Sequence, residues 1–295
     1  MNSLIQHLLE SGPITTDGAW GTQLQALGMP IGECPDAWNL TEPDRVEMVA
    51  RSYVQAGSQI ILTNTFGASR VRLAEFGLAD QVAEINRAGA EISRRAAGDL
   101  AQVFASIGPT GKMLMMGQVT EDELRAAFAE QAQALAEGGS QGLVIETMSD
   151  PAEAKIAVAA AKTTGLPVVG CMTFDTGKEK DRTMMGTTPE QAADALAQAG
   201  ADVIGTNCGQ GVEGFVRICQ RLRAQTGLPL WIKANAGLPE MKDGKIVYNT
   251  TPDQFATFVQ ALLDAGANFI GGCCGTSPAF IQAIREKIQA LTGKN

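Results

Sequence analysis

Residues 264–273 read Asp264-Ala-Gly-Ala-Asn-Phe-Ile-Gly-Gly-Cys273, and three other segments, 55–64, 137–146 and 198–207, align with them without gaps. Each segment has the pattern of a helix end, a glycine that terminates the helix, and a short buried strand. A helix leading into an apolar strand, repeated along a chain, is typical of parallel βα units. One unit takes roughly 30–35 residues. Because the segments start 61 to 82 residues apart, each interval is expected to hold one further strand.

Four apolar runs supply these further strands, at residues 14–17, 103–107, 167–172 and 229–234. Eight strands that alternate with helices predict an α/β fold, a single (β/α)8 TIM barrel, in one domain that covers residues 1–295. Thr188-Pro189 and Thr251-Pro252 have the pattern of capped helix starts and support this division. The polar segment 174–186 is long for its place and is expected to form a lid.

The composition narrows the possible partners. A net charge of −9 disfavours binding to nucleic acid or to an anionic membrane, and no apolar run reaches the length of a membrane span. No secretory signal is seen, so the six cysteines are expected to be reduced thiols in the cytoplasm. The single histidine, His7, disfavours a Ser-His-Asp triad, and a metal site would have to use Cys, Asp, Glu or Asn.

Polar and sulfur-bearing residues cluster at the C-terminal ends of the expected strands, where barrels of this kind carry their active residues. They are Asp17, Asn64, Glu146, Asn207, Cys208, Asn235, Cys273 and Cys274. Three thiolates on one ion, with the fourth position open, describe a catalytic zinc site. The Cys-Cys pair taken alone is equally compatible with two buried thiols or a vicinal disulfide.

Such a site suits methylation of a small thiol. A zinc-bound thiol is ionised, whereas a free thiol with a pKa of about 8.5 is only a few per cent thiolate near pH 7. Glu146, with Asp17, is expected to hold the ammonium group of a thiol amino acid. The turn that begins Asp17-Gly18 offers backbone N–H groups for its carboxylate, although it is also compatible with an ordinary glycine-rich loop.

Residues 209–214 match the GxGxxG pattern of a dinucleotide-binding turn. That pattern requires an acidic residue about 20 positions further on. No Asp or Glu occurs between Gly214 and Glu240, so a nucleotide-binding oxidoreductase is only a remote alternative.

The chain resembles the zinc-dependent homocysteine S-methyltransferases, most closely the homocysteine-binding module of cobalamin-dependent methionine synthase. The matching motifs are Asp17-Gly18, Thr63-Asn64, Gly108-Pro109, Glu146-Thr147, Asn207-Cys208, Asn235–Pro239 and Gly271–Thr276, within a match from about Ile14 to Ala290. The resemblance implies a (β/α)8 barrel in which Cys208, Cys273 and Cys274 bind Zn²⁺ and Asn235 lies near the metal. It also implies homocysteine contacts from Asp17, Gly18 and Glu146, with Asn64 and Asn207 at the same site.

The resemblance leaves the methyl donor open. Methionine synthase carries its cobalamin on further modules, so a corrinoid protein on a separate chain is one expected donor and an S-methylmethionine-type small molecule is another. Betaine-dependent relatives carry an aromatic residue where Thr147 follows Glu146, which disfavours betaine. The alternative function is a thiol- or zinc-binding subunit of a multi-chain methyltransferase that acts on another small thiol.

Overall fold

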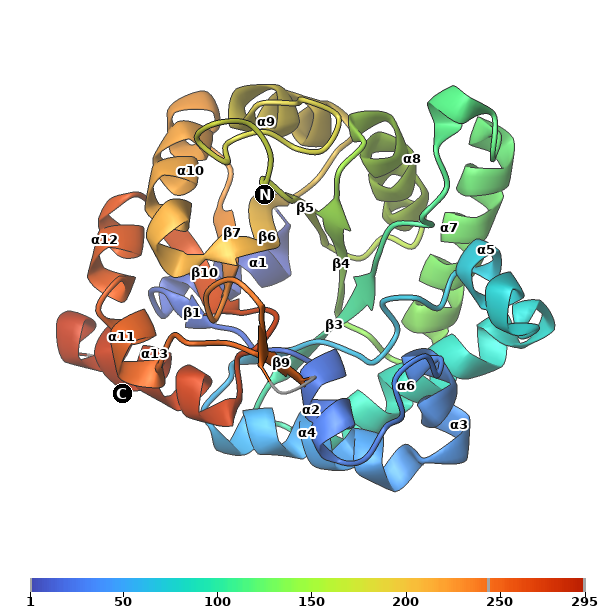
Figure 1. Ribbon diagram of the computed structural model, residues 1–295, viewed down its shortest axis with the longest axis horizontal. Coiled ribbons are helices and arrows are strands. Elements are labelled where there is room, and N and C mark those ends of the chain that lie inside the picture. Colours follow the sequence, from blue (N-terminus) through green and yellow to red (C-terminus); the bar gives the residue numbers. More distant parts are fainter. Residues whose placement is uncertain (1, 243–244, 294–295) are drawn as a thin grey trace.

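Eight strands form one parallel sheet that closes into a barrel, which confirms the predicted fold (Figure 1). The computed structural model describes residues 2–242 and 245–293. The sheet order is β1-β10-β7-β6-β5-β4-β3-β2, and a parallel bridge between Thr16 and Ile60 joins its two ends. The barrel strands are β1 (Ile14–Thr15), β2 (Ile60–Ile61), β3 (Gln102–Ile107), β4 (Gly142–Met148), β5 (Val168–Met172), β6 (Val203–Gly211), β7 (Leu230–Asn235) and β10 (Ala267–Gly272).

Helices surround the barrel in the order that the repeat predicts (Figure 1). The outer layer consists of α4 (Pro43–Gln55), α6 (Val82–Ala97), α7 (Glu121–Glu137), α8 (Pro151–Lys162), α9 (Pro189–Gln198), α10 (Val212–Gln225), α11 (Pro252–Ala256) with α12 (Val259–Asp264), and α13 (Pro278–Thr292). Shorter helices lie in the loops: α2 (Gly21–Ala26), α3 (Trp38–Thr41) and α5 (Arg70–Leu73). The expected starts of α9 and α11 are confirmed, since Thr188 and Thr251 each form a capping box.

The four aligned segments share one backbone conformation. Their glycines, Gly57, Gly139, Gly200 and Gly266, have φ angles of 93°, 88°, 94° and 96°, which other residues rarely adopt. Each glycine turns the chain from the end of an outer helix into the next barrel strand. The repeat in the sequence therefore corresponds to one helix-to-strand turn that occurs four times in the structure.

Two apolar layers stabilise the barrel. The larger lies between the strands and the outer helices. The smaller, which we call the interior cluster, fills the barrel itself and includes Phe104, Trp231 and Phe269, all fully buried. Phe104 stacks on Trp231 with ring centroids 6.2 Å apart, and Phe269 lies 5.3 Å from the same ring. These large rings leave the interior packed rather than open.

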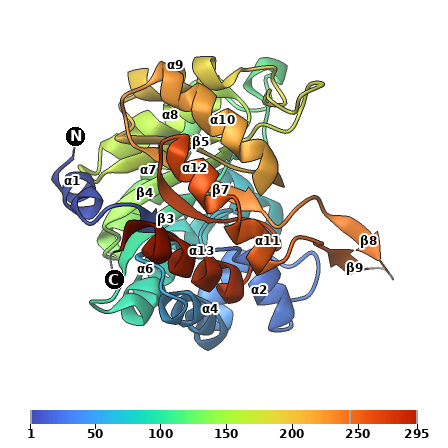
Figure 2. The ribbon, with the colours of Figure 1, turned by 90° about the vertical axis from the view of Figure 1, so that its left-hand side faces the viewer.

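The two ends of the barrel carry different structures (Figure 2). Helix α1 (Ser3–Glu10) closes the N-terminal end and buries Ile5 against the interior cluster. A hairpin that the sequence did not predict, β8 (Glu240–Lys242) and β9 (Lys245–Val247), projects from the opposite end. Among the described residues, no helix is both long and apolar enough to cross a lipid bilayer.

Candidate metal and substrate site

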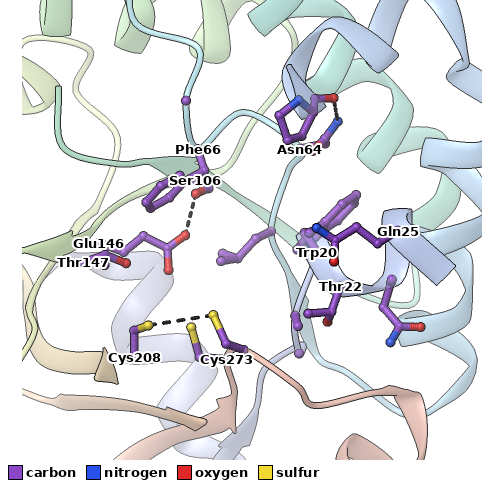
Figure 3. Close-up of a pocket in the computed structure, with 18 of the residues that line it drawn as sticks. Trp20, Thr22, Gln25, Asn64, Phe66, Ser106, Glu146, Thr147, Cys208 and Cys273 are labelled. Carbon is purple, nitrogen blue, oxygen red and sulfur yellow. Dashed lines mark hydrogen bonds between the residues drawn. The ribbon is translucent and has the colours of Figure 1, made fainter. Parts of the chain in front are cut away.

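A cavity of about 750 Å³ opens at the C-terminal ends of the barrel strands (Figure 3). Three of the cysteines, Glu146 and Lys233 line its inner part. Phe66 and Phe76, each 43% exposed, line it nearer to solvent. Residues 174–186, which were expected to form a lid, contribute nothing to the lining; Gln210 instead holds this segment through hydrogen bonds to the carbonyls of Phe174 and Lys180.

The structure brings the three predicted cysteines together. Cys208 lies in β6, and Cys273 and Cys274 directly follow β10. The three Sγ atoms all lie within 4.8 Å of one another, and those of Cys208 and Cys274 are 3.8 Å apart. Tetrahedral zinc with Zn–S bonds of about 2.3 Å separates two sulfur ligands by about 3.8 Å. The spacing therefore suits one zinc ion.

Backbone contacts fix the positions of these sulfurs. Cys208 has a φ of 62°, an uncommon conformation for a residue with a side chain. The Cys273 N–H donates to the carbonyl of Ala234 at 2.7 Å, and the Ala236 N–H donates to the carbonyl of Cys274 at 3.0 Å. The vicinal cysteines are thus tied on both sides to the end of β7.

Without a cation the three thiols cannot all ionise. Hydrogen bonds from Cys273 and Cys274 lower the pKa of Cys208 well below its ordinary value. The same contact with Cys208 raises the pKa of Cys274 and of Cys273. One negative charge is therefore shared by the cluster, and a divalent cation would ionise the remaining thiols.

Asn235, the last residue of β7, also fits a bound cation. Its side chain hydrogen-bonds to Cys208, which helps to lower the pKa of that thiol. Its Oδ1 atom is buried, and no hydrogen-bond donor reaches it within the part of the chain that the structure describes. A buried oxygen without a partner, beside three thiols, is the kind of group that a cation or a ligand N–H would satisfy.

Glu146 faces the same space as the sulfurs (Figure 3). It is 7% exposed, and burial raises the pKa of its carboxyl although nearby Lys233 opposes the shift. Its Oε1 accepts a hydrogen bond from Ser106 Oγ at 2.5 Å, and its Oε2 accepts one from Asn207 Nδ2 at 3.2 Å. These two donors orient the carboxylate toward the cavity.

Asn207 connects the carboxylate to the sulfur cluster. Its Nδ2 donates to Thr147 Oγ1 at 2.8 Å and lies 3.8 Å from Cys273 Sγ, while its Oδ1 accepts from the Thr147 N–H at 2.7 Å. Thr147 has a φ of 62°, which is strained for a β-branched residue. Strain of this kind concentrates at functional sites.

Asp17 and Asn64 make contacts within the protein. Asp17 is fully buried and binds Lys233, whereas Asn64 Nδ2 donates to the Pro35 carbonyl at 2.7 Å and so holds the loop beside the cavity. Gly18 lines the cavity, and an added Cβ there would lie 2.8 Å from both Thr276 Oγ1 and Tyr53 Oη. No larger residue fits at Gly18 without displacing these groups.

Sequence reasoning missed several residues that line the cavity, among them Ser106, Lys233 and Tyr248. The signal for Lys233 was present, because a lysine interrupts the otherwise apolar run 230–234. Ser106 and Tyr248 gave no such signal, since both stand in unremarkable local sequence. His7 lies in α1, at the end of the barrel opposite the cavity.

Fold and site together define a barrel protein with a cluster of three thiols at the C-terminal ends of its strands. The family model for homocysteine S-methyltransferase matches residues 14–288, and the chain belongs to this family. It is 30% identical over 291 residues to methionine synthase of Mycobacterium tuberculosis and 29% identical to that of Mycobacterium leprae. In both comparisons the match covers 92% of this chain but only 24% of the relative.

Solved structures support the same fold. The metallated form of the homocysteine methyltransferase MmuM from Escherichia coli superposes with a TM-score of 0.81 at 24% identity, over 97% of this chain and 100% of MmuM. The apo form of MmuM gives a TM-score of 0.74 at 22% identity.

Proposed function

We propose that this chain, as one barrel domain, transfers a methyl group to the sulfur of homocysteine to form methionine. Cys208, Cys273 and Cys274 would hold the zinc ion. One observation carries the proposal: three thiols from two separate strands converge within 4.8 Å beside a cavity that also exposes the buried carboxylate of Glu146. Membership of the homocysteine S-methyltransferase family supports the same substrate.

Different groups of the protein would bind the sulfur, the ammonium and the carboxylate of the substrate. Zinc, when bound, would keep the substrate sulfur ionised. Glu146, held by Ser106 and Asn207, would bind the ammonium group, and backbone N–H groups near Gly18 would bind the carboxylate. Asn64 would shape the wall by holding the loop at Pro35.

The transfer itself needs no general base at the sulfur. The thiol proton leaves to solvent before transfer. The sulfur electron pair then forms the new bond to the methyl carbon, and the donor departs with the electron pair of its own broken bond. A site with no histidine suits this chemistry, because the rate depends on aligning the sulfur with the methyl group.

The outer part of the cavity would receive the methyl donor. Phe66 and Phe76 line it and remain partly exposed. We propose either a methylated corrinoid protein or an S-methylmethionine-type molecule as the donor. The corrinoid protein is favoured by the resemblance to cobalamin-dependent methionine synthase, and this chain spans about a quarter of the length of the two mycobacterial methionine synthases. A cytoplasmic location is supported by the six cysteines, all of which are free thiols.

The test measures zinc content and methionine formation with each donor in turn. Cys208→Ser should lose both zinc and at least about 10³-fold in transfer rate. Cys219→Ser is the matched control, because Cys219 lies in α10, away from the cavity, and a serine hydroxyl there can still donate to the Ala265 carbonyl.

Three outcomes would contradict parts of the proposal. Full zinc content in Cys208→Ser would contradict the ligand assignment. Zinc binding without methionine from any donor would favour the subunit alternative. Binding of a nicotinamide cofactor would favour the oxidoreductase.

A further inference from the structure

Asp36 is a buried carboxylate in the wall of the cavity that no step of the proposed reaction uses. It lies in the short 3-10 helix η1 (Pro35–Ala37) and is 4% exposed. Its Oδ1 accepts a hydrogen bond from the Gly67 N–H at 2.9 Å, and its Oδ2 accepts one from the Cys34 thiol at 3.8 Å. A thiol is a weak donor, so Oδ2 keeps most of its capacity to accept a further hydrogen bond.

The charge of Asp36 is not compensated inside the protein. Burial raises the pKa of its carboxyl to about 6, so the group is still mostly ionised near pH 7. Among the described residues, no basic side chain lies within ion-pair distance of Asp36, and nearby Arg72 pairs with Glu75 at 2.9 Å. A buried charge is costly unless a partner compensates it. A cation in the cavity would supply that partner.

The contact with Gly67 does not by itself explain a buried acid at position 36. An asparagine could accept the same N–H without burying a charge. Glu153 shows the contrast, since it is also buried but does not line the cavity. Its carboxylate accepts from both the N–H and the hydroxyl of Thr110, at 2.7 and 2.6 Å. Asp36 is therefore a buried carboxylate that a ligand can reach.

The surroundings of Asp36 indicate the chemistry of such a ligand. Its bond to Gly67 brings it beside the segment that carries Phe66, whose ring lines the cavity and is partly exposed (Figure 3). Aromatic faces attract onium cations. Arg72 also lines the cavity and has N–H donors beyond the one that it gives to Glu75. A carboxylate, an aromatic ring and a guanidinium together suit an amino acid that carries a second, methylated cation.

The cavity has room for two amino acids, and this part of its wall is held in place. Pockets of about 300–1,000 Å³ hold one drug-sized ligand, which has more atoms than two small amino acids together. The cavity of about 750 Å³ lies in this range. Asn64 Nδ2 donates to the Pro35 carbonyl at 2.7 Å, and Gly67 holds Asp36 itself. The carboxylate is thus pre-organised, which lowers the entropic cost of binding.

We propose that Asp36 binds the ammonium group of the methyl donor, and that this donor is a sulfonium amino acid of the S-methylmethionine type. Arg72 binds the donor carboxylate, and the ring of Phe66 contacts the sulfonium. Homocysteine keeps Glu146 for its own ammonium. This inference rests on the proposed function and chooses between its two donors.

The reaction is balanced with this donor. The homocysteine sulfur forms a bond to one methyl carbon of the sulfonium. The bond from that carbon to the sulfonium sulfur breaks, and its electron pair neutralises the positive charge. The donor leaves as a thioether, so no further reductant or cofactor is consumed.

The experiment measures binding to the zinc-loaded protein by isothermal titration calorimetry. The ligands are S-methyl-L-methionine and 4-(dimethylsulfonio)butanoate, which has the same sulfonium and carboxylate but no ammonium. Asp36→Asn should weaken binding of S-methyl-L-methionine by about tenfold or more and that of the analogue by less than about threefold. Homocysteine affinity should stay within about threefold of the wild type, because Glu146 is unchanged.

Two further variants keep the outcome decisive. Arg72→Gln, at a side chain 38% exposed, should weaken both sulfonium ligands by about threefold or more, because both carry the carboxylate. Glu153→Gln is the matched control, a buried acid away from the cavity, and should change neither affinity. Zinc content and the thermal midpoint show whether each variant is folded.

The outcomes that overturn this proposal differ from those that contradict the proposed function. Equal losses for the two sulfonium ligands in folded Asp36→Asn, or no loss for either, would overturn the role of Asp36. Unchanged binding of both in Arg72→Gln would overturn the role of Arg72. Wild-type protein that forms methionine with a methylated corrinoid protein but not with S-methyl-L-methionine would overturn the choice of donor alone. Wild-type protein that forms methionine with no donor would contradict the proposed function itself.

Discussion

The two ends of the barrel are built from the same strands but hold opposite kinds of side chain. The N-terminal half of the interior is apolar and closed by α1, with Phe104 and Trp231 fully buried. The C-terminal half holds buried charges, and Thr147 and Cys208 lie there in strained backbone. Polar burial and strain both cost stability, so the second half is built for binding.

Along a single strand, the change from apolar to polar or charged interior side chains takes two residues. Phe104 is followed by Ser106 in β3, and Trp231 by Lys233 in β7. Residues two apart in a strand face the same side, so both members of each pair point into the barrel, in successive layers. The layer that holds Phe104 and Trp231, here called the lower layer, stabilises the fold by packing. The layer that holds Ser106 and Lys233, here called the upper layer, lines the candidate site.

The sharpest separation of the two ends is expected from the proposed zinc ion. Removal of zinc with a chelator should reduce methyl transfer by roughly 10³-fold or more, because the substrate sulfur loses both ionisation and alignment. The barrel should stay folded, since the apolar half does not depend on the ion, and far-UV circular dichroism would show this. Added zinc should restore activity. Full activity in protein shown to be free of metal would refute a role for the three thiols.

The apolar end should control stability instead. Phe104→Ala should lower the free energy of unfolding by about 3–5 kcal/mol, because it removes a ring that stacks on Trp231 and leaves a cavity. Leu100→Ala, at a site 81% exposed, should change it by less than about 0.5 kcal/mol. Urea denaturation measures both. Equal effects of the two substitutions would mean that the interior cluster does not carry the fold.

The upper layer should respond to pH. Ser106→Ala removes a hydrogen bond that lowers the pKa of Glu146, and so raises a pKa that burial has already raised. Ammonium binding requires the ionised carboxylate, so homocysteine affinity is present above this pKa and is lost as pH falls through it. The variant should lose affinity at higher pH than the wild type, by about 3–10-fold on the acidic side.

The measurement is KM for homocysteine against pH, with kcat as the reference. Ser140→Ala is a matched control, because Ser140 is also buried and its Oγ has no partner among the described residues. Identical pH profiles for Ser106→Ala and the wild type would contradict a role for Ser106 in homocysteine binding.

The smallest effect concerns backbone strain. Lys180 has a φ of 49° in a segment away from the cavity, so Lys180→Gly should stabilise the protein by about 0.5–1 kcal/mol without changing activity. Thr147→Gly relieves similar strain but removes the hydroxyl that Asn207 contacts, so it should weaken homocysteine binding. Thermal midpoints and KM values distinguish the two. Unchanged binding in Thr147→Gly would show that the strain at Thr147 serves no role in recognition.

Much of the architecture was predictable from local sequence. The glycine that ends each helix and the apolar run that follows are short-range features, so the repeat identified four barrel strands, and the spacing of its copies indicated the other four. The three sulfurs were predictable because Cys208, Cys273 and Cys274 each come shortly after an apolar run in the sequence. Hairpin β8–β9 was not predicted, since two strands of three residues give too weak a pattern.

The roles of the carboxylates could not be predicted in the same way. Asp17 and Lys233 are 216 residues apart in the chain, and neither position indicates the other. Asp17 and Glu146 both follow apolar runs and appear equivalent in sequence. Their difference depends on which donors the closed barrel brings to each of them.

The sequence by itself determined the barrel, because hydrophobic periodicity and glycine turns act over a few residues, and it determined which thiols would stand at the rim. Only the tertiary structure decided which charges meet. Closure of the barrel sets the sulfurs within 4.8 Å of one another and encloses Lys233 with Asp17. Electrostatic interactions act through space between groups distant in sequence, so their partners are fixed only when the strands have taken their places.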